Sequence, residues 1–424
     1  MPISTALHRN GAIKGAVIRE TTEENRASSP LEAFFDLCFV VAVAQVSTGL
    51  HETLAEHRIS AALIAYSTMF FAVWWAWMNF TWFANAHDAD DIPYRLLTLT
   101  QVAGALVMAT GVLAVFEHND FTTVTIGYVI MRVAQVTQWV RVARAFESMH
   151  RRAMRYAVGI SVVQVLWVLH IFTHGTTGVC FGFVLVVLEI AVPVWAEQAA
   201  TENATHVEHI TDRYGLFTLI VLGEAVSAAT LGVQQAARSG ITADLVAVAG
   251  SGLLISFVAW WLYFGSPHRG GPATVRGSFE WGYGHYLIFA SLGAIGAGVH
   301  LATQYVSTSA RVAAAAALGA TEAAPATASA TVEQISTRVA SLAIAVPVAV
   351  FLLAMVILSA IAGSLRRAKL GPILGGAAVI LIGGLSTPVV VTAVVVAVTM
   401  VIVIACLIIV DLPAAAAARP APEP

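Results

Sequence analysis

The chain has 424 residues, of which 58% are hydrophobic and only 11% are charged. In soluble globular proteins about a quarter of the residues are charged, so this composition indicates a polytopic membrane protein. The formal net charge of −3, with 22 Lys and Arg residues, excludes the broad basic surface that a nucleic acid partner requires.

Residues 1–29 are polar and contain no signal peptide pattern, so we expect them to remain as a cytoplasmic segment. Apolar runs of roughly 18 to 25 residues follow, long enough for a helix to cross the bilayer. They predict an all-α membrane protein with about twelve transmembrane helices. Ten or eleven is the alternative, because "GGLSTP" leaves little room to turn between the last two. The predicted spans are residues 32–50, 59–83, 93–116, 121–142, 153–173, 176–196, 211–235, 242–265, 283–305, 339–363, 370–387 and 389–411.

These spans form a core of nine helices (residues 30–306) and a group of three (339–411). An Ala- and Thr-rich loop, 307–338, separates them, and we expect it to be external. Residues 412–424 have the composition of a disordered tail. If the N-terminus is placed in the cytoplasm, 17 of the 22 Lys and Arg residues are cytoplasmic. Membrane proteins typically have such an excess of Lys and Arg on the cytoplasmic side. We therefore predict that both termini are cytoplasmic.

Two pairs of segments indicate an internal duplication. "EAFFDLCFVVAVAQVS" from Glu32 aligns with "DRYGLFTLIVLGEAVS" from Asp212, and "FAVWWAW" from Phe71 aligns with "FVAWWLY" from Phe257. The matched spans are the first and second against the seventh and eighth. A parallel repeat of six plus six helices is a common transporter plan.

Ionisable residues within spans are costly, and they are candidates for function by default. Glu32 and Asp36 are four residues apart, so they share one helix face at the start of the first span. Two like charges at this spacing repel unless they share a proton or a cation. The alternative is that both acids stabilise the positive N-terminal end of the helix.

Deeper in the membrane lie Glu224, near the middle of the seventh span, and Arg132, midway through the fourth. Gln135 and Gln138 continue a polar stripe from Arg132 at spacings of three. One interpretation is a structural ion pair between Arg132 and Glu224. The other is a proton or cation path in which Asp36 and Glu224 carry the cation, Glu32 supports Asp36 and Arg132 is the counter-charge.

Further candidates are weaker. Glu189 lies in the sixth span nearer its cytoplasmic end, and His285 opens the ninth span as a proton carrier or a hydrogen-bonded interfacial residue. The loops "HDADD" (87–91, with Asp88 and Asp91) and 197–213 are acidic, and they predict either an acidic vestibule or merely solvated loops. Glu202, His206 and His209 in the second loop follow metal-ligand spacings, but such residues are ordinary in polar loops and we predict no metal site.

Familiar catalytic motifs are missing from the sequence: it has no nucleotide-binding glycine loop, nucleophile elbow or zincin motif. We therefore expect no cofactor and no enzymatic activity. Gly293, Gly296 and Gly298 predict close helix packing in the ninth span. The leading hypothesis is a permease of the secondary-transporter type that moves a proton or cation with a small solute. A membrane sensor or regulator, and an ion channel, are the alternatives.

Several stretches together carry a family resemblance: "PLEAFFDLCFVVAVAQV" (30–46), "WWAWMNFTWFANAHDADD" (74–91), "RVAQVTQWVRVAR" (132–144), "DRYGLFTLIVLGEAV" (212–226) and "YGHYLIF" (283–289). Over roughly residues 30 to 410 the chain resembles the bacterial low temperature requirement protein A family. The resemblance implies a multi-pass protein of the bacterial plasma membrane, named for a growth phenotype in the cold, without a defined biochemical activity. The family motif falls on Glu32, Phe35, Asp36, Arg213, Gly223 and Glu224, which adds Arg213 to the candidates.

Overall fold

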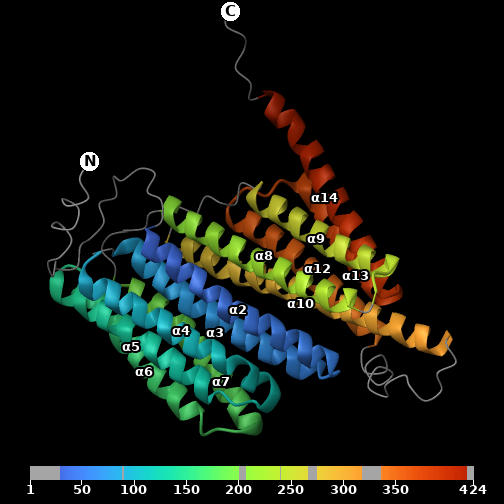
Figure 1. Cartoon of the computed structure of the whole chain (residues 1–424). Coiled ribbons are helices and arrows are strands. Elements are labelled where there is room, and N and C mark those ends of the chain that lie inside the picture. Colours follow the sequence, from blue (N-terminus) through green and yellow to red (C-terminus); the bar gives the residue numbers. More distant parts are fainter. Residues whose placement is uncertain are drawn as a thin grey trace, which may run out of the picture. The chain divides into compact units, whose positions relative to one another are not determined.

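The computed structural model describes residues 29–87, 90–199, 207–238, 240–265, 275–317 and 336–417. In these ranges the chain forms twelve α-helices and no strand, as predicted for an all-α protein (Figure 1). The helices are α2 (Pro30–Ala55), α3 (Ile59–Ala86), α4 (Ile92–His118), α5 (Thr122–Ala145), α6 (His150–His170), α7 (Gly175–Glu197), α8 (Val207–Ala237), α9 (Ala243–Phe264), α10 (Val275–Ala317), α12 (Thr337–Ile361), α13 (Arg367–Ser386) and α14 (Val389–Ala417).

Eleven of the described helices are long and apolar enough to cross a membrane. Helices suit this environment because they satisfy their own backbone hydrogen bonds where no water is present. The exception is α5, which has 24 residues and is therefore about 36 Å long. Its length suffices, but Arg132, Gln135 and Gln138 make it more polar than the others. The prediction of a polytopic helical membrane protein is confirmed.

Several helices are longer than their predicted spans, and two of them continue into segments that were predicted to be a loop and a disordered tail. α10 has 43 residues, or about 65 Å, twice the thickness of the hydrocarbon core. It ends at Ala317, so the first part of the loop predicted over 307–338 is helical. α14 ends at Ala417 and includes part of the tail predicted to be disordered. In both places alanine-rich sequence, which favours helix, continues past the apolar run.

The chain divides into two compact units. Unit 1 comprises Met1–Val46 and Thr68–Phe217, and unit 2 comprises Ser47–Ser67 and Thr218–Pro424. The boundary passes through α2, α3 and α8 and does not fall between the sixth and seventh spans. The predicted duplication of six plus six helices therefore stays a prediction.

Within unit 1, α4, α5, α6 and α7 pack in sequence order, each against the next (Figure 1). Glycines bring α4 and α5 close together. A Cβ atom at Gly127 would lie 2.4 Å from the backbone nitrogen of Met108 and 2.6 Å from the carbonyl oxygen of Gly104. Such contact between backbones is typical of membrane helices, which lack a hydrophobic driving force for association. It holds α5 with its polar stripe firmly in place.

Unit 2 is organised around α12, which packs against α10, α13 and α14, while α9 packs against α10 and α14. The close approach predicted for the glycines of α10 is confirmed at two positions. A Cβ atom at Gly298 would lie 2.0 Å from the carbonyl oxygen of Ala343 on α12. One at Gly296 would lie 2.6 Å from the Cα atom of Ala225 on α8.

Replacing Gly298 by Ala should lower the free energy of unfolding by about 1–3 kcal/mol, because the added methyl group forces α10 and α12 apart. Thermal unfolding of the purified protein in detergent measures the effect. The matched control is Gly250→Ala in α9, where a Cβ atom meets nothing within 4 Å. That variant should unfold at the same temperature or slightly higher, because Ala favours helix over Gly. Equal midpoints for both variants would contradict the contact.

Candidate functional site

The start of α2 is built as a capping box. The backbone N–H of Ser29 donates to Glu32 Oε2 at 2.8 Å, and the N–H of Glu32 donates to Ser29 Oγ at 3.3 Å. The sequence "SPLE" encodes this reciprocal pair, with Pro30 at the first helical position where a missing N–H costs nothing. One of the two interpretations of Glu32, stabilisation of a helix N-terminus, is thereby confirmed. The same carboxylate also lies near Arg213 and His209 of α8.

Asp36, one turn along α2, forms a double hydrogen bond with Arg213 of α8. Arg213 donates from Nε to Asp36 Oδ2 at 3.1 Å and from Nη2 to Oδ1. Trp77 of α3 donates from Nε1 to the same Oδ1 at 2.7 Å. Both charged side chains are 0% exposed. A paired guanidinium and carboxylate in this two-pronged geometry is a strong and specific contact.

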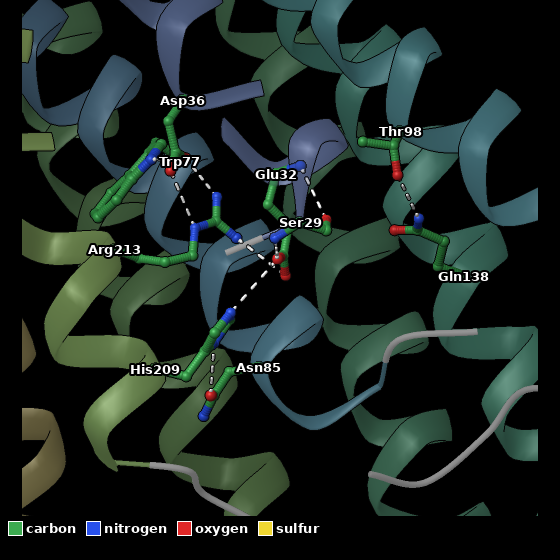
Figure 2. Close-up of polar contacts among 9 residues, drawn as sticks. All are labelled: Ser29, Glu32, Asp36, Trp77, Asn85, Thr98, Gln138, His209 and Arg213. Carbon is green, nitrogen blue, oxygen red and sulfur yellow. Dashed lines mark hydrogen bonds and ion pairs between the residues drawn. The ribbon is translucent and has the colours of Figure 1, made fainter. Parts of the chain in front are cut away.

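Glu32 is held less tightly by the same arginine. Figure 2 shows Arg213 between the two acids, and its Nη1 atom lies 3.8 Å from Glu32 Oε1, beyond hydrogen-bonding distance. His209, one turn before Arg213 on α8, places Nε2 3.4 Å from Glu32 Oε2. Its Nδ1 atom lies 3.1 Å from Oδ1 of Asn85 on α3. Glu32, Asp36, Arg213 and His209 together form what we call the acid–arginine cluster.

Aromatic rings enclose the acid–arginine cluster. The Phe35 and Phe80 rings are 4.0 Å apart, the Trp77 and Phe217 rings are 4.2 Å apart, and the Arg213 guanidinium lies 5.6 Å from the centre of the Phe80 ring. Such walls lower the local dielectric constant and strengthen every electrostatic interaction inside. The cluster is therefore a charged site isolated from bulk water.

A second buried site surrounds Glu189 of α7, which is 4% exposed. Trp75 donates from Nε1 to Oε2 at 2.8 Å, Tyr128 donates from its hydroxyl to Oε1 at 2.8 Å, and Trp167 donates from Nε1 to Oε1 at 3.2 Å. Arg132 completes this Glu189 cluster with an ion pair from Nη2 to Oε2 at 3.3 Å. The acid therefore has four donors, from α3, α5 and α6.

This pairing differs from the prediction, which joined Arg132 to Glu224. The sequence favours Glu224 over Glu189 as a functional acid, because Glu189 lies nearer the end of its span. Depth along a helix, however, does not determine on which face of the helix an acid lies. The sequence also did not single out Trp75, Tyr128 or Trp167. Buried Trp and Tyr usually place their polar atoms on a partner, and this tendency was the available signal.

The polar stripe predicted on α5 is buried as expected. Arg132 donates from Nη1 to Gln135 Oε1 at 2.7 Å. Gln138 accepts from Gln101 Nε2 at 3.0 Å. It also donates from Nε2 to Thr98 Oγ1 at 3.5 Å, the contact that Figure 2 shows. The stripe thus continues from the Glu189 cluster into the contact between α4 and α5.

The two described acids at the end of the first acidic loop, Asp90 and Asp91, have arginine partners. Asp91 caps α4 by accepting from the N–H of Tyr94 at 2.8 Å and pairs with Arg141 at 2.6 Å. Asp90 pairs with Arg95 at 2.9 Å. Charges neutralised in this way make a poor cation-attracting vestibule. Asp90 is exposed, as the solvated-loop interpretation expects, whereas Asp91 is buried and fits neither interpretation. Asp88, Glu202 and His206 lie outside the described residues.

The remaining candidates lie in unit 2. Glu224 on α8 is half-buried, and the described part of the chain offers it no hydrogen-bond or ion-pair partner. His285 is 0% exposed, with Nδ1 2.8 Å from the carbonyl oxygen of Trp281 and Nε2 3.2 Å from the hydroxyl of Tyr263. It is a hydrogen-bonded buried residue, one of its two predicted roles. A path from Asp36 to Glu224 would join the two units and stays a prediction.

Comparison with known proteins adds two findings. The profile of a family described as "Bacterial low temperature requirement A protein (LtrA)" matches residues 27–407, which include every residue of both clusters. A protein of Rhizobium meliloti (strain 1021), described as "Uncharacterized protein RA0937", is 26% identical over 255 residues. That alignment covers 58% of this chain, and the chain spans about three fifths (60%) of the length of that relative.

Proposed function

The chain belongs to the bacterial low temperature requirement A protein family, and we propose that this integral membrane protein is a permease that moves a small solute together with a proton or another cation. The acid–arginine cluster is its cation site. The membrane is the bacterial plasma membrane, with both termini on the cytoplasmic side, as the distribution of Lys and Arg favours.

The charge balance of the acid–arginine cluster carries this proposal. Counted over its own four side chains, the acid–arginine cluster has two carboxylates, Glu32 and Asp36, and one guanidinium, Arg213, so these four carry one negative charge in excess when His209 is neutral. All four side chains are almost fully buried. A net charge is expensive in such surroundings, so one more cation completes the site, and a proton is the smallest that does so.

The contacts of His209 support a position for this proton. Asn85 Oδ1 can only accept, so Nδ1 of His209 must donate to it. The contact from Nε2 to Glu32 Oε2 then needs a second proton, either on Nε2 or on the carboxyl group. Both contacts are hydrogen bonds at once only when the pair of Glu32 and His209 holds one exchangeable proton.

Asp36 is the fixed member of the cluster. Arg213 and Trp77 supply three donors to it, whereas Glu32 lies 3.8 Å from the same guanidinium. The sequence suggested that Asp36 carries the cation and that Glu32 supports it. The geometry favours the reverse, in which Asp36 holds Arg213 in position and Glu32, with His209, binds and releases the cation.

Flux into liposomes tests the proposal. Purified protein in vesicles with an internal pH indicator should admit protons down a gradient, and Glu32→Gln should reduce the rate by about tenfold or more, since loss of a general acid–base group costs 10²–10⁴-fold in enzymes. Gln at this position still completes the capping box, so the variant should fold. Glu117→Gln, at a residue 58% exposed at the end of α4, is the matched control.

Glu224→Gln belongs in the same assay, and we expect it to abolish coupled flux while the protein stays inserted. Normal flux in a folded Glu32→Gln variant would contradict the role of the cluster. If the protein shows no flux under any proton, sodium or potassium gradient, the alternative function, a membrane sensor, is favoured. Proton flux that no solute added to the vesicles increases would indicate a channel.

A further inference from the structure

Unit 2 contains a cavity of about 280 Å³ between α9, α12, α13 and α14. Its polar lining lies at helix ends: Ser359 near the end of α12, Lys369 near the start of α13 and Asp411 on α14. Leu352 and Ile404 line it seven residues further into the same helices, about 10 Å away along the axes. The cavity is therefore amphipathic, with a polar mouth and an apolar interior.

Positive charge dominates the mouth. Lys369 pairs with Asp411 at 2.8 Å, and Arg366 approaches the other oxygen of the same carboxylate at 3.4 Å. Arg367 follows directly and is exposed. Lys369 and Arg366 together against the one carboxylate of Asp411 leave an excess of one positive charge at the described part of the mouth. Asp411 is 49% exposed, so both its partners can also reach an anion that arrives from the membrane surface.

The cavity is bordered by exposed apolar side chains. Ile408 is 44% exposed and Trp261 is 54% exposed, and both line it. Tryptophan is typical of the interface between hydrocarbon and water. With the predicted topology, these helix ends lie on the cytoplasmic side. The occupant therefore comes from the inner leaflet and is itself amphipathic.

We propose that this cavity binds one anionic phospholipid, with the phosphate at Lys369 and Arg366 and the beginning of an acyl chain between α12 and α14. Basic pockets between membrane helices on the cytoplasmic side are suited to anionic head groups. The volume is about nine times that of a water molecule in the liquid. It accommodates the part of the lipid next to the head group, and the rest of the acyl chains lie in the bilayer.

Native mass spectrometry of the full chain in detergent, after incubation with phosphatidylglycerol or phosphatidylcholine, tests this site. The protein should retain phosphatidylglycerol at least tenfold more tightly. Replacing both Lys369 and Arg366 by Gln should weaken its retention by about fivefold for each charge removed. Arg338→Gln, at the opposite end of α12, is the charge control and should change nothing.

A second pair of variants tests the apolar interior independently of charge. Ile408→Trp fills the cavity from its exposed rim and should abolish retention of the lipid. Ile409→Trp is the matched control, because Ile409 is 63% exposed and does not line the cavity. Equal retention of both lipids, or equal effects of the two Trp variants, would overturn the proposal. Full displacement of the lipid by inorganic phosphate would show a simple anion site and would overturn it as well.

Discussion

Replacing Arg213 by Gln should destabilise the protein by about 3–5 kcal/mol, the cost of breaking a buried ion pair by removing one partner. The variant leaves Glu32 and Asp36 one helical turn apart, both buried, without the guanidinium between them. Asp36 also loses two of its three donors. The thermal midpoint in detergent, compared with that of the intact chain, measures the loss.

Two further variants distinguish the loss of the buried ion pair from a general effect of removing an arginine. Arg95→Gln is the control, because Arg95 pairs with Asp90 at 45% and 52% exposure, where an ion pair contributes about 0–1 kcal/mol. The double change of Arg213→Gln with Asp36→Asn should recover much of the stability, since no unpaired charge stays at Asp36. If Arg213→Gln and Arg95→Gln unfold alike, the buried pair is not what stabilises unit 1.

The fold was largely predictable because each step rests on a strong physical constraint. A run of about twenty apolar residues has few alternatives to a membrane helix, and the helices lie where those runs lie. The residues at which the helices end were less predictable. At α10 and α14 alanine-rich sequence carries the helix on past the apolar run, so apolar length alone misses the boundary.

The acid–arginine cluster was partly predictable. Glu32 and Asp36 share a helix face by spacing alone, and the burial cost of acids marked them as candidates. Arg213 became a candidate only through the family resemblance. His209 was considered only as a metal ligand, since nothing in a single sequence shows that α8 places it against the first turn of α2.

Pairings between distant helices were the least predictable feature. Arg132 has several acids within the same range of depths, and their helix faces are set by packing that a sequence does not display. The contact that decides the matter is the close packing of α4 on α5 at Gly104 and Gly127. This packing fixes the rotation of α5 about its own axis. It therefore also determines which side of α5 carries Arg132 towards Glu189.

The two clusters therefore differ in chemistry although both contain buried charges. In the acid–arginine cluster two acids face one arginine, a balance that suits the binding of a further cation. In the Glu189 cluster one acid faces one arginine and accepts from three further donors. A pair without net charge, whose acid already accepts from four donors, has no need of a further proton. Its expected role is to hold α3, α5, α6 and α7 together.

Glu189→Gln should accordingly lower the free energy of unfolding by about 3–5 kcal/mol, because Arg132, which is 1% exposed, keeps a buried charge whose counter-charge has been removed. Adding Arg132→Gln should restore most of it, since the double variant buries no net charge. In liposomes the double variant should admit protons at the rate of the intact chain, because the acid–arginine cluster is complete without either residue. A double variant that is stable but has lost proton flux would contradict this division of roles. It would return Arg132 to the cation path on which its position midway through α5 first placed it.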